Sequence, residues 1–375
     1  MYFNLFNLLI FFGALQGIII GIVLLFFKKK EDQSTLFLSW LIFSLSLTIG
    51  KHFLIDFSKA NQWDIIVKPP VSCFLLMGPF LFFYVRATLG KKIKTNIKFF
   101  IHLIPGLIFL VIQLIIFIES GFGEELMDQS IISIFQLIEQ VLGLLSLMIY
   151  GYLSLKLVIK YQKKITEFYS NIEYITLQWL INLLIGLFIG WLFLLFLTMV
   201  DLFVFDFTLP QSAYYLLFIY VGVIIHYFGL RKLTMIHFPT LRPLEVLEKK
   251  PDIQKNDIES DKDEDTKEIQ KLEKIMVENK PFLDPNLTLD SLSDLLGVHS
   301  KKLSMILNQK MGTSFYDFIN KARVEEVKVK IADPGNDHLT ILGIALDSGF
   351  NSKSSFNAIF KKYTGMTPRQ YKNTL

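Results

Sequence analysis

Two short segments near the C-terminal end of the chain carry lysine and asparagine side chains at the spacing of successive helical turns. Lysine ammonium groups neutralise phosphate charges, and an asparagine amide can bond both N6 and N7 of adenine in the major groove. Such a surface favours contact with DNA. The side chains predicted to make this contact are Lys301, Lys302, Met305, Asn308, Asn351, Lys353, Ser354, Asn357, Lys361 and Lys362.

The first of these segments follows another predicted helix and a tight turn. Thr288 can cap a helix with a leucine-rich face, and Gly297 then turns the chain. The next helix is predicted over 301–311, with Ser300 as its cap. Two short helices joined by a turn that contains glycine form a helix-turn-helix, whose second helix fits the major groove.

The same arrangement is predicted a second time, after a longer helix over roughly 314–332. Thr340 begins a short helix and the chain turns at Gly349. Either Asn351 or Ser352 caps the helix that follows. The C-terminal region is therefore predicted to hold two helix-turn-helix motifs joined by one long helix.

Three motifs within residues 267–375 extend this pattern, namely Gly349-Phe350, Phe356-x-x-x-Phe360-Lys361-Lys362 and Gly365-Met366-Thr367-Pro368-x-x-Tyr371. With the doubled helix-turn-helix, they resemble the DNA-binding domain of the AraC/XylS family of bacterial transcription regulators. The resemblance implies two recognition helices that enter successive major grooves on one side of the duplex. Met305 and Ala358 stand where the family often has arginine, so we expect lysines to supply the attraction to phosphate.

The composition of residues 1–242 is quite different. Charged side chains make up about 13% of this region, against about 31% of residues 243–375. A bilayer core needs about 20 apolar residues per helix. Seven windows of this kind lie near 3–27, 35–55, 69–89, 97–118, 130–155, 175–200 and 209–230.

Basic residues set the predicted orientation of these windows. The run 28–30 is all lysine and follows the first window, whereas the basic residues of a signal peptide precede its apolar stretch. With the N-terminus outside, the cytoplasmic loops carry 15 Lys and Arg and the outside loops carry only Lys51, Lys59 and Lys68. We therefore expect a multi-pass protein of the bacterial cytoplasmic (inner) membrane whose C-terminal domain lies in the cytoplasm.

Glycines at the spacing Gly13-x-x-x-Gly17-x-x-x-Gly21 share one helix face, where a neighbouring backbone can approach closely. Packing within the chain is the preferred interpretation, and a dimerisation face is the alternative. Gly186 and Gly190 repeat the spacing once.

Polar groups are costly at membrane depth and mark candidate signal-sensing positions. Glu139 lies in the middle of a window, with Gln136 and Gln140 near it, and its role is either signal sensing or structural hydrogen bonding. Cys73 is the single cysteine, and the six histidines show no metal-ligand spacing, so neither a metal nor a cofactor is predicted.

The sequence predicts an all-α fold in three parts. Residues 1–236 form a bundle of seven transmembrane helices, residues 237–266 a flexible acidic linker, and residues 267–375 the DNA-binding domain. The net charge of +4 sums +5 for residues 1–242, −5 for 243–266 and +4 for 267–375.

The predicted function is a membrane-embedded transcription regulator that couples a signal sensed in or through the bundle to promoter binding. The expected partners are double-stranded promoter DNA, the lipid bilayer, RNA polymerase, a second copy in a homodimer, and an effector that the sequence does not identify. No catalytic motif is present, so we do not expect an enzyme. The alternative is a membrane transporter or receptor whose helical tail is regulatory or adaptor-like.

Overall fold

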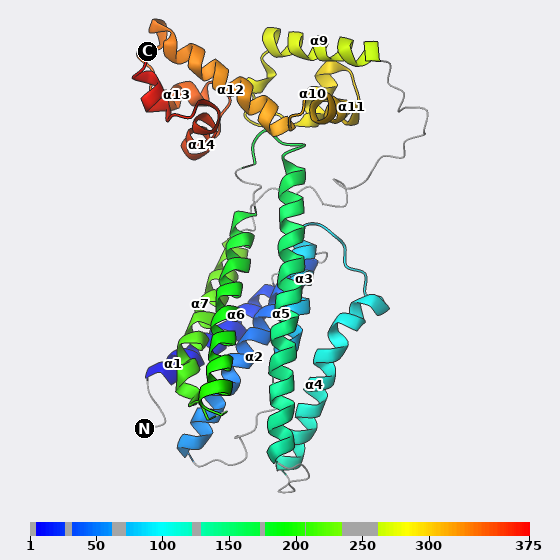
Figure 1. The fold of residues 1–375 in the computed structure, drawn as a ribbon, viewed down its shortest axis with the longest axis vertical. Helices are drawn as coiled ribbons and strands as arrows, with labels where there is room; N and C mark the ends of the chain where they lie inside the picture. Colours follow the sequence, from blue (N-terminus) through cyan, green and yellow to red (C-terminus); the bar gives the residue numbers. More distant parts are fainter. Residues whose placement is uncertain are drawn as a thin grey trace. The chain divides into compact units, whose positions relative to one another are not determined.

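In the computed structural model, regular secondary structure in the described part of the chain is helical throughout (Figure 1). The all-α prediction is therefore confirmed. The chain divides into two compact units, one of 1–159 with 177–245 and the other of 160–176 with 246–375. The structure describes residues 5–26, 32–61, 73–121, 129–172, 177–206, 208–234 and 262–375.

The N-terminal unit contains the apolar helices, and each predicted window overlaps one of them. Six are long and apolar enough to cross a membrane by length and composition, whereas α3 has 15 described residues and is shorter. The helices are α1 (Leu5–Phe26), α2 (Gln33–Asn61), α3 (Phe74–Thr88), α4 (Ile97–Gly121), α5 (Gln129–Ile165), α6 (Gln178–Val204) and α7 (Tyr215–Thr234), with α5 ending in the other unit.

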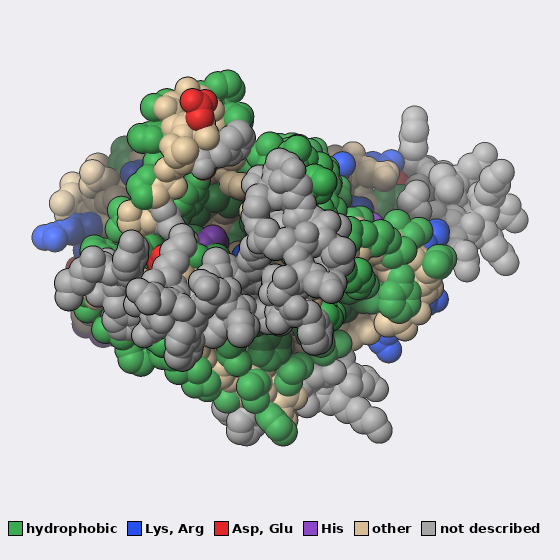
Figure 2. Space-filling model, turned by 90° about the horizontal axis from the view of Figure 1, so that it is seen from below, with side chains coloured by type: hydrophobic (Ala, Val, Ile, Leu, Met, Phe, Trp, Pro, Cys, Tyr) green, Lys and Arg blue, Asp and Glu red, His purple; other side chains and the backbone are tan. Residues whose placement is uncertain are grey.

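Large apolar side chains are exposed along these helices. Phe26 of α1 is 83% exposed and Phe203 of α6 is 76% exposed. Apolar side chains also cover much of the helix surface visible in Figure 2. Water-soluble monomers rarely expose contiguous apolar patches larger than a few hundred Å².

The glycines of α1 lie against helices of the same chain. A Cβ at Gly17 would lie 1.9 Å from Ser46 Oγ of α2 and 2.9 Å from Ile225 Cγ2 of α7, and a Cβ at Gly21 would meet the Phe43 ring. A Cβ at Gly13 would lie in ordinary contact with the backbone of α7. Packing within the chain, the preferred interpretation, is therefore confirmed for this glycine face.

The C-terminal unit extends beyond the predicted range 267–375. It includes 160–176, and its first helix after the apolar unit begins at Lys262. The helices are α9 (Lys262–Glu278), α10 (Leu289–Leu296), α11 (Ser300–Met305), α12 (Phe315–Ala332), α13 (Ile341–Leu346), α14 (Lys353–Thr364) and α15 (Pro368–Lys372).

Most of the predicted acidic linker, 237–261, lies outside the described residues. Its last five residues, 262–266, are predicted as flexible linker but belong to helix α9. Asp265 explains this difference, because its side chain is buried and its carboxylate pairs with Lys310 at 2.9 Å. Acidic side chains also stabilise the first turn of a helix through the helix dipole.

The connecting helix α12 contributes to two hydrophobic cores. Phe315 and Ile319 pack with α10 and α11, while Val324, Val327 and Ile331 pack with α13 and α14. One rigid helix therefore supports both helix-turn-helix motifs.

Hydroxyl caps start most of the helices at the predicted positions. Thr288 begins α10 in a capping box with Ser291, and Thr340 caps α13. Of the two predicted caps for α14, Ser352 is the one used, since its hydroxyl accepts from the Ser355 amide at 3.1 Å.

The predicted cap of α11 is wrong by one residue. Ser300 is the first helical residue, and the His299 carbonyl accepts from the amides of Lys302 and Leu303. The predicted helix over 301–311 is present but changes type, because α11 ends at Met305 and a wider π-helix continues it over Ile306–Lys310.

The α1 glycine face leads to a test of bundle packing. Gly17→Ala should destabilise the N-terminal unit by about 1–3 kcal/mol, since the added methyl group overpacks a contact between helices. Gly151→Ala is the matched control, because a Cβ there would meet nothing within 4 Å. Thermal unfolding of the full chain in detergent measures both variants, and equal melting temperatures would contradict this account of the packing.

Candidate nucleic-acid interface

The first helix-turn-helix consists of α10, α11 and the turn between them. Gly297 adopts φ +71°, a left-handed conformation that glycine tolerates, and its amide bonds the Asp294 carbonyl at 3.1 Å. The Val298 amide bonds the Ser293 carbonyl at 3.1 Å, which completes the end of α10. Leu292 and Leu303 bury the facing sides of the two helices.

The predicted DNA contacts of this motif lie away from its core. Lys301 and Asn308 are exposed, and Lys302 and Met305 are half-buried. The Asn308 amide donates to the Ser304 carbonyl at 2.9 Å, so its amide group is oriented along the helix. The structure therefore leaves Lys301 and Asn308 as the more accessible pair on this helix.

The second motif consists of α13, α14 and a turn at Gly349. Gly349 adopts φ +90°, and a Cβ there would lie 2.3 Å from the Phe282 carbonyl oxygen. Phe350, directly after the turn, is buried in the second core. Only glycine fits this position, because both the backbone conformation and the close carbonyl exclude a side chain.

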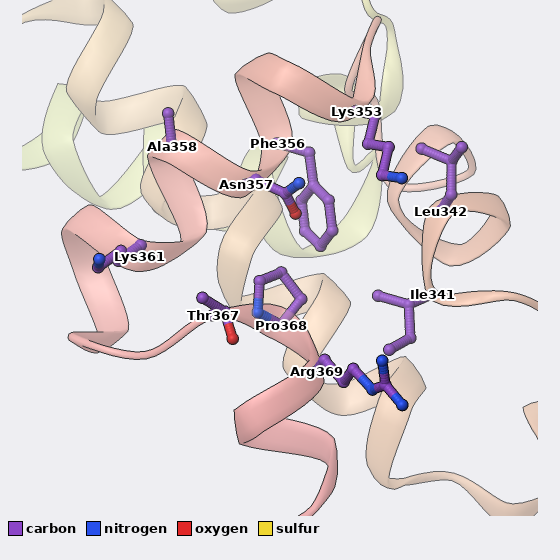
Figure 3. Close-up of a pocket in the computed structure, with 10 residues that line it drawn as sticks. All are labelled: Ile341, Leu342, Lys353, Phe356, Asn357, Ala358, Lys361, Thr367, Pro368 and Arg369. Atoms are coloured by element: carbon purple, nitrogen blue, oxygen red, sulfur yellow. The ribbon is translucent and has the colours of Figure 1, made fainter.

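The exposed face of α14 carries three predicted residues four positions apart. Lys353, Asn357 and Lys361 are all exposed, as is Ser354 beside them. Figure 3 shows the first three along α14, around a hollow of about 510 Å³ that α13 and α15 also line. Arg369 of α15 lines the same hollow and was not predicted, although its position directly after the Thr-Pro helix start could have indicated it.

Two predicted residues of the second motif have other surroundings. Asn351 is half-buried in the turn before α14. Lys362 is exposed, but its ammonium pairs with the Asp317 carboxylate of α12 at 2.6 Å. The Tyr363 hydroxyl donates to the same carboxylate at 2.8 Å, and the Ser314 hydroxyl donates to it at 2.9 Å. Lys362 therefore joins the end of α14 to the start of α12.

These bonds decide the charge state of Asp317. Partial burial alone would raise the pKa of the Asp317 carboxyl, but bonds from Lys362, Tyr363 and Ser314 outweigh burial and hold this pKa below its usual value. The pKa of Tyr363 is raised, first by burial and then by its bond to the Asp317 carboxylate. Asp317 is therefore ionised at neutral pH and stabilises the contact between α12 and α14.

A buried arginine of α12 was missed by the sequence analysis. Arg323 is 1% exposed, and its guanidinium donates to the Phe282 carbonyl at 2.8 Å and the Asp284 carbonyl at 2.7 Å. Burial lowers its pKa to about 10, against the attraction of Asp284, so the side chain remains charged at neutral pH. Its position could have indicated burial, because it belongs to a series of residues spaced four apart, namely Phe315, Ile319, Arg323, Val327 and Ile331.

The three polar side chains of α5 that the sequence singled out have different surroundings. Glu139 is buried and accepts a hydrogen bond from the Gln113 amide of α4 at 2.6 Å. Gln140 donates to Thr198 Oγ1 of α6 at 2.7 Å, whereas Gln136 is exposed. The three predicted side chains therefore do not form one cluster.

A second buried carboxylate of the bundle was not predicted. Asp56 of α2 accepts from the Asn7 amide of α1 at 3.2 Å and from the Tyr215 hydroxyl of α7 at 2.8 Å. The predicted apolar window ends at residue 55, one residue before Asp56, so Asp56 was not counted among the polar groups at membrane depth. In the part of the chain that the structure describes, no group of three His, Cys, Asp or Glu side chains could hold a metal ion.

Comparison with known proteins identifies the C-terminal region. Residues 292–374 match the family described as "Helix-turn-helix domain". An HTH-type transcriptional regulator of Staphylococcus aureus (strain COL) is 36% identical over 87 residues, which are 23% of this chain and 11% of that protein. The HTH-type transcriptional regulator YobQ of Bacillus subtilis (strain 168) is 37% identical over 89 residues, which are 24% of this chain and 36% of that protein.

These matches cover only part of each relative. The aligned residues span about a tenth of the staphylococcal relatives and about a third of YobQ. No solved structure matches the chain. The predicted AraC-type resemblance is confirmed for the C-terminal domain, which is joined to a region with six long apolar helices.

The Asp317 contact has a pH dependence that can be measured. Because the folded-state pKa of Asp317 is depressed, its stabilisation is present above the unfolded pKa of about 3.9 and is lost as pH falls through the folded value. Asp317→Asn should lower the melting temperature of the C-terminal unit by a few degrees at pH 7, on the order of 1 kcal/mol. The difference from wild type should shrink toward pH 3.

Calorimetry of the full chain in detergent between pH 3 and pH 7 measures this effect. Asp337→Asn is the control, since Asp337 is 71% exposed and pairs only loosely with Lys372 at 3.6 Å. If both variants showed the same constant offset across the pH range, the role assigned to Asp317 would be wrong.

Proposed function

We propose that this chain is a membrane-embedded, sequence-specific regulator of transcription. Its apolar helices anchor it in the bilayer and receive a signal, and its C-terminal domain binds promoter DNA. The observation that carries the proposal is the exposed row of Lys353, Asn357 and Lys361 on the second helix of a helix-turn-helix. The lysines suit phosphate and the amide suits an adenine edge.

The described apolar helices support membrane embedding. Six of them have the length and composition of a membrane span, and their outer surfaces are apolar. Helices satisfy all of their internal backbone groups and are one of the two structures that can cross a bilayer. The DNA-binding function then requires that the C-terminal domain lie on the cytoplasmic side.

The C-terminal unit itself supports this orientation. It includes 160–176, the connection between α5 and α6, so this connection and the DNA-binding domain belong on the same side of the membrane. Lysines 156, 160, 163 and 164 lie at this end of α5, which the positive-inside rule places in the cytoplasm. We therefore assign the protein to the bacterial cytoplasmic membrane.

Partners and signal follow from the same proposal. Two copies bound side by side on a promoter would raise each other's effective concentration, so we assign a homodimer on DNA. RNA polymerase is the partner through which promoter binding changes transcription. The buried groups Glu139 and Asp56 are candidate positions for sensing, because buried carboxylates in a membrane bundle are costly and are usually functional.

Crosslinking of the intact protein to the chromosome tests the proposal as a whole. Sequencing of the recovered DNA should give discrete enriched sites upstream of genes, and these sites should be lost when 262–375 are deleted. A chain without enriched sites whose bundle carries a solute across vesicles would contradict the proposal and favour the transporter alternative.

The row on α14 can be tested on DNA recovered in this way. Lys353→Ala should weaken binding similarly on all sequences and reduce the salt slope by about 1, as expected for one lost phosphate contact. Asn357→Ala should cost about 1–3 kcal/mol on the preferred site and relax specificity at one base pair. Binding by the full chain in detergent, titrated at several salt concentrations, measures both effects.

Lys274→Ala is the matched control for the charge change, since Lys274 is 70% exposed and lies on α9 rather than on a recognition helix. It should leave the affinity and the salt slope near the wild-type values. Equal effects of Lys274→Ala and Lys353→Ala would show that α14 does not lie in the major groove.

A further inference from the structure

The connection between α5 and α6 is built into the DNA-binding domain. Residues 166–172 follow the end of α5, and their bonds to the C-terminal helices join positions more than 100 residues apart. Ser170 is 1% exposed, and Phe168 packs against the core of the first helix-turn-helix. We call residues 166–172 the docking segment.

The docking segment caps two helices of the domain through its backbone. The Phe168 carbonyl accepts from the amide of Leu289, the first residue of α10, at 3.0 Å. The Thr166 carbonyl accepts from the amide of Tyr316, in the first turn of α12, also at 3.0 Å. Amides in the first turn of a helix have no acceptor within that helix, so they depend on partners of this kind.

Ser170 attaches the same segment to buried side chains of α12. Its carbonyl accepts from the Asn320 amide at 2.9 Å, and its hydroxyl accepts from Arg323 Nη2 at 3.1 Å. The hydroxyl also donates to the Leu287 carbonyl at 2.7 Å. The Asn320 amide also donates to the Tyr316 carbonyl at 2.9 Å. Buried polar groups without a partner are strongly unfavourable, so withdrawal of the segment would leave one N–H of Asn320 and part of the Arg323 guanidinium without acceptors.

We propose that the docking segment is an intrachain regulatory contact: the first helix-turn-helix binds DNA at full affinity while the segment is docked, and its withdrawal lowers that affinity. This inference rests on the proposed function. The occupant of the surface is the chain's own α5–α6 connection, which leaves the apolar unit at position 159 and enters the next apolar helix at 178. A change in the bundle that moves either helix end therefore acts on the segment directly.

A disulfide can test whether the segment is docked. Tyr169 and Thr288 face each other in an isolated antiparallel bridge, flanked by the bonds between 168 and 289 and between 170 and 287. Such a pair has a Cα separation of about 4.5 Å, within the range for a disulfide. Tyr169→Cys with Thr288→Cys, in a Cys73→Ser background, should therefore crosslink under mild oxidation in the full chain.

A second variant withdraws the segment. Ser170→Pro removes the amide that bonds the Leu287 carbonyl at 3.4 Å and also the hydroxyl that bonds Arg323. Affinity for a DNA duplex taken from the strongest chromosomal site should fall at least tenfold. Glu167→Ala is the matched control in the same segment, since its carboxylate pairs with Lys164, and it should bind as wild type does.

Combining the two changes separates docking from simple unfolding. In the same Cys73→Ser background, the variant that combines Tyr169→Cys, Thr288→Cys and Ser170→Pro should regain most of the lost affinity on oxidation and lose it again on reduction. The inference is overturned if wild type binds the duplex but Ser170→Pro binds equally well, or if the cysteine pair does not crosslink. Crosslinking is scored without DNA, so if the cysteine pair crosslinks as expected but the wild-type chain binds no DNA, the proposed function is overturned instead.

Discussion

A buried guanidinium needs a hydrogen-bond acceptor for each of its N–H groups, and this requirement organises the C-terminal unit around Arg323. The acceptors come from the turn at Phe282 and Asp284, from Asn320 on its own helix, and from Ser170 in the α5–α6 connection. The turn of the second helix-turn-helix lies against the same group, because a Cβ at Gly349 would lie 2.9 Å from Arg323 Nε. One side chain therefore links the turn before α10 and the turn of the second motif to the segment that follows α5.

Local rules predicted most of the helices. Apolar spacing and hydroxyl caps placed α10, α13 and α15 from Thr288, Thr340 and Thr367, since these signals lie within a few residues of the helices they start. The α5–α6 connection could not be assigned in this way, because its partners are defined only by folding. Ser170 and Arg323 are 153 positions apart, and no periodic pattern joins them.

The part of the candidate site that lies on a single helix could also be predicted from local sequence spacing, whereas contacts between distant helices could not. Lys353, Asn357 and Lys361 follow one another at helical spacing, so their common face could be predicted, and the structure leaves all three exposed. The partner of Lys362 is Asp317, 45 positions earlier on another helix, and sequence spacing carries no information about such a pair. Glu139 and Gln140 likewise have partners on different helices, α4 and α6, whose positions sequence spacing does not give.

The proposed function joins a membrane bundle to a DNA-binding surface through a chain that passes between the two units more than once. Retention of DNA by membrane vesicles tests it most directly. Inside-out vesicles that contain the full chain should retain labelled duplex from an enriched chromosomal site, with a steep dependence on salt, and right-side-out vesicles should retain it only after permeabilisation. Retention by intact right-side-out vesicles, or by neither kind, would contradict the account.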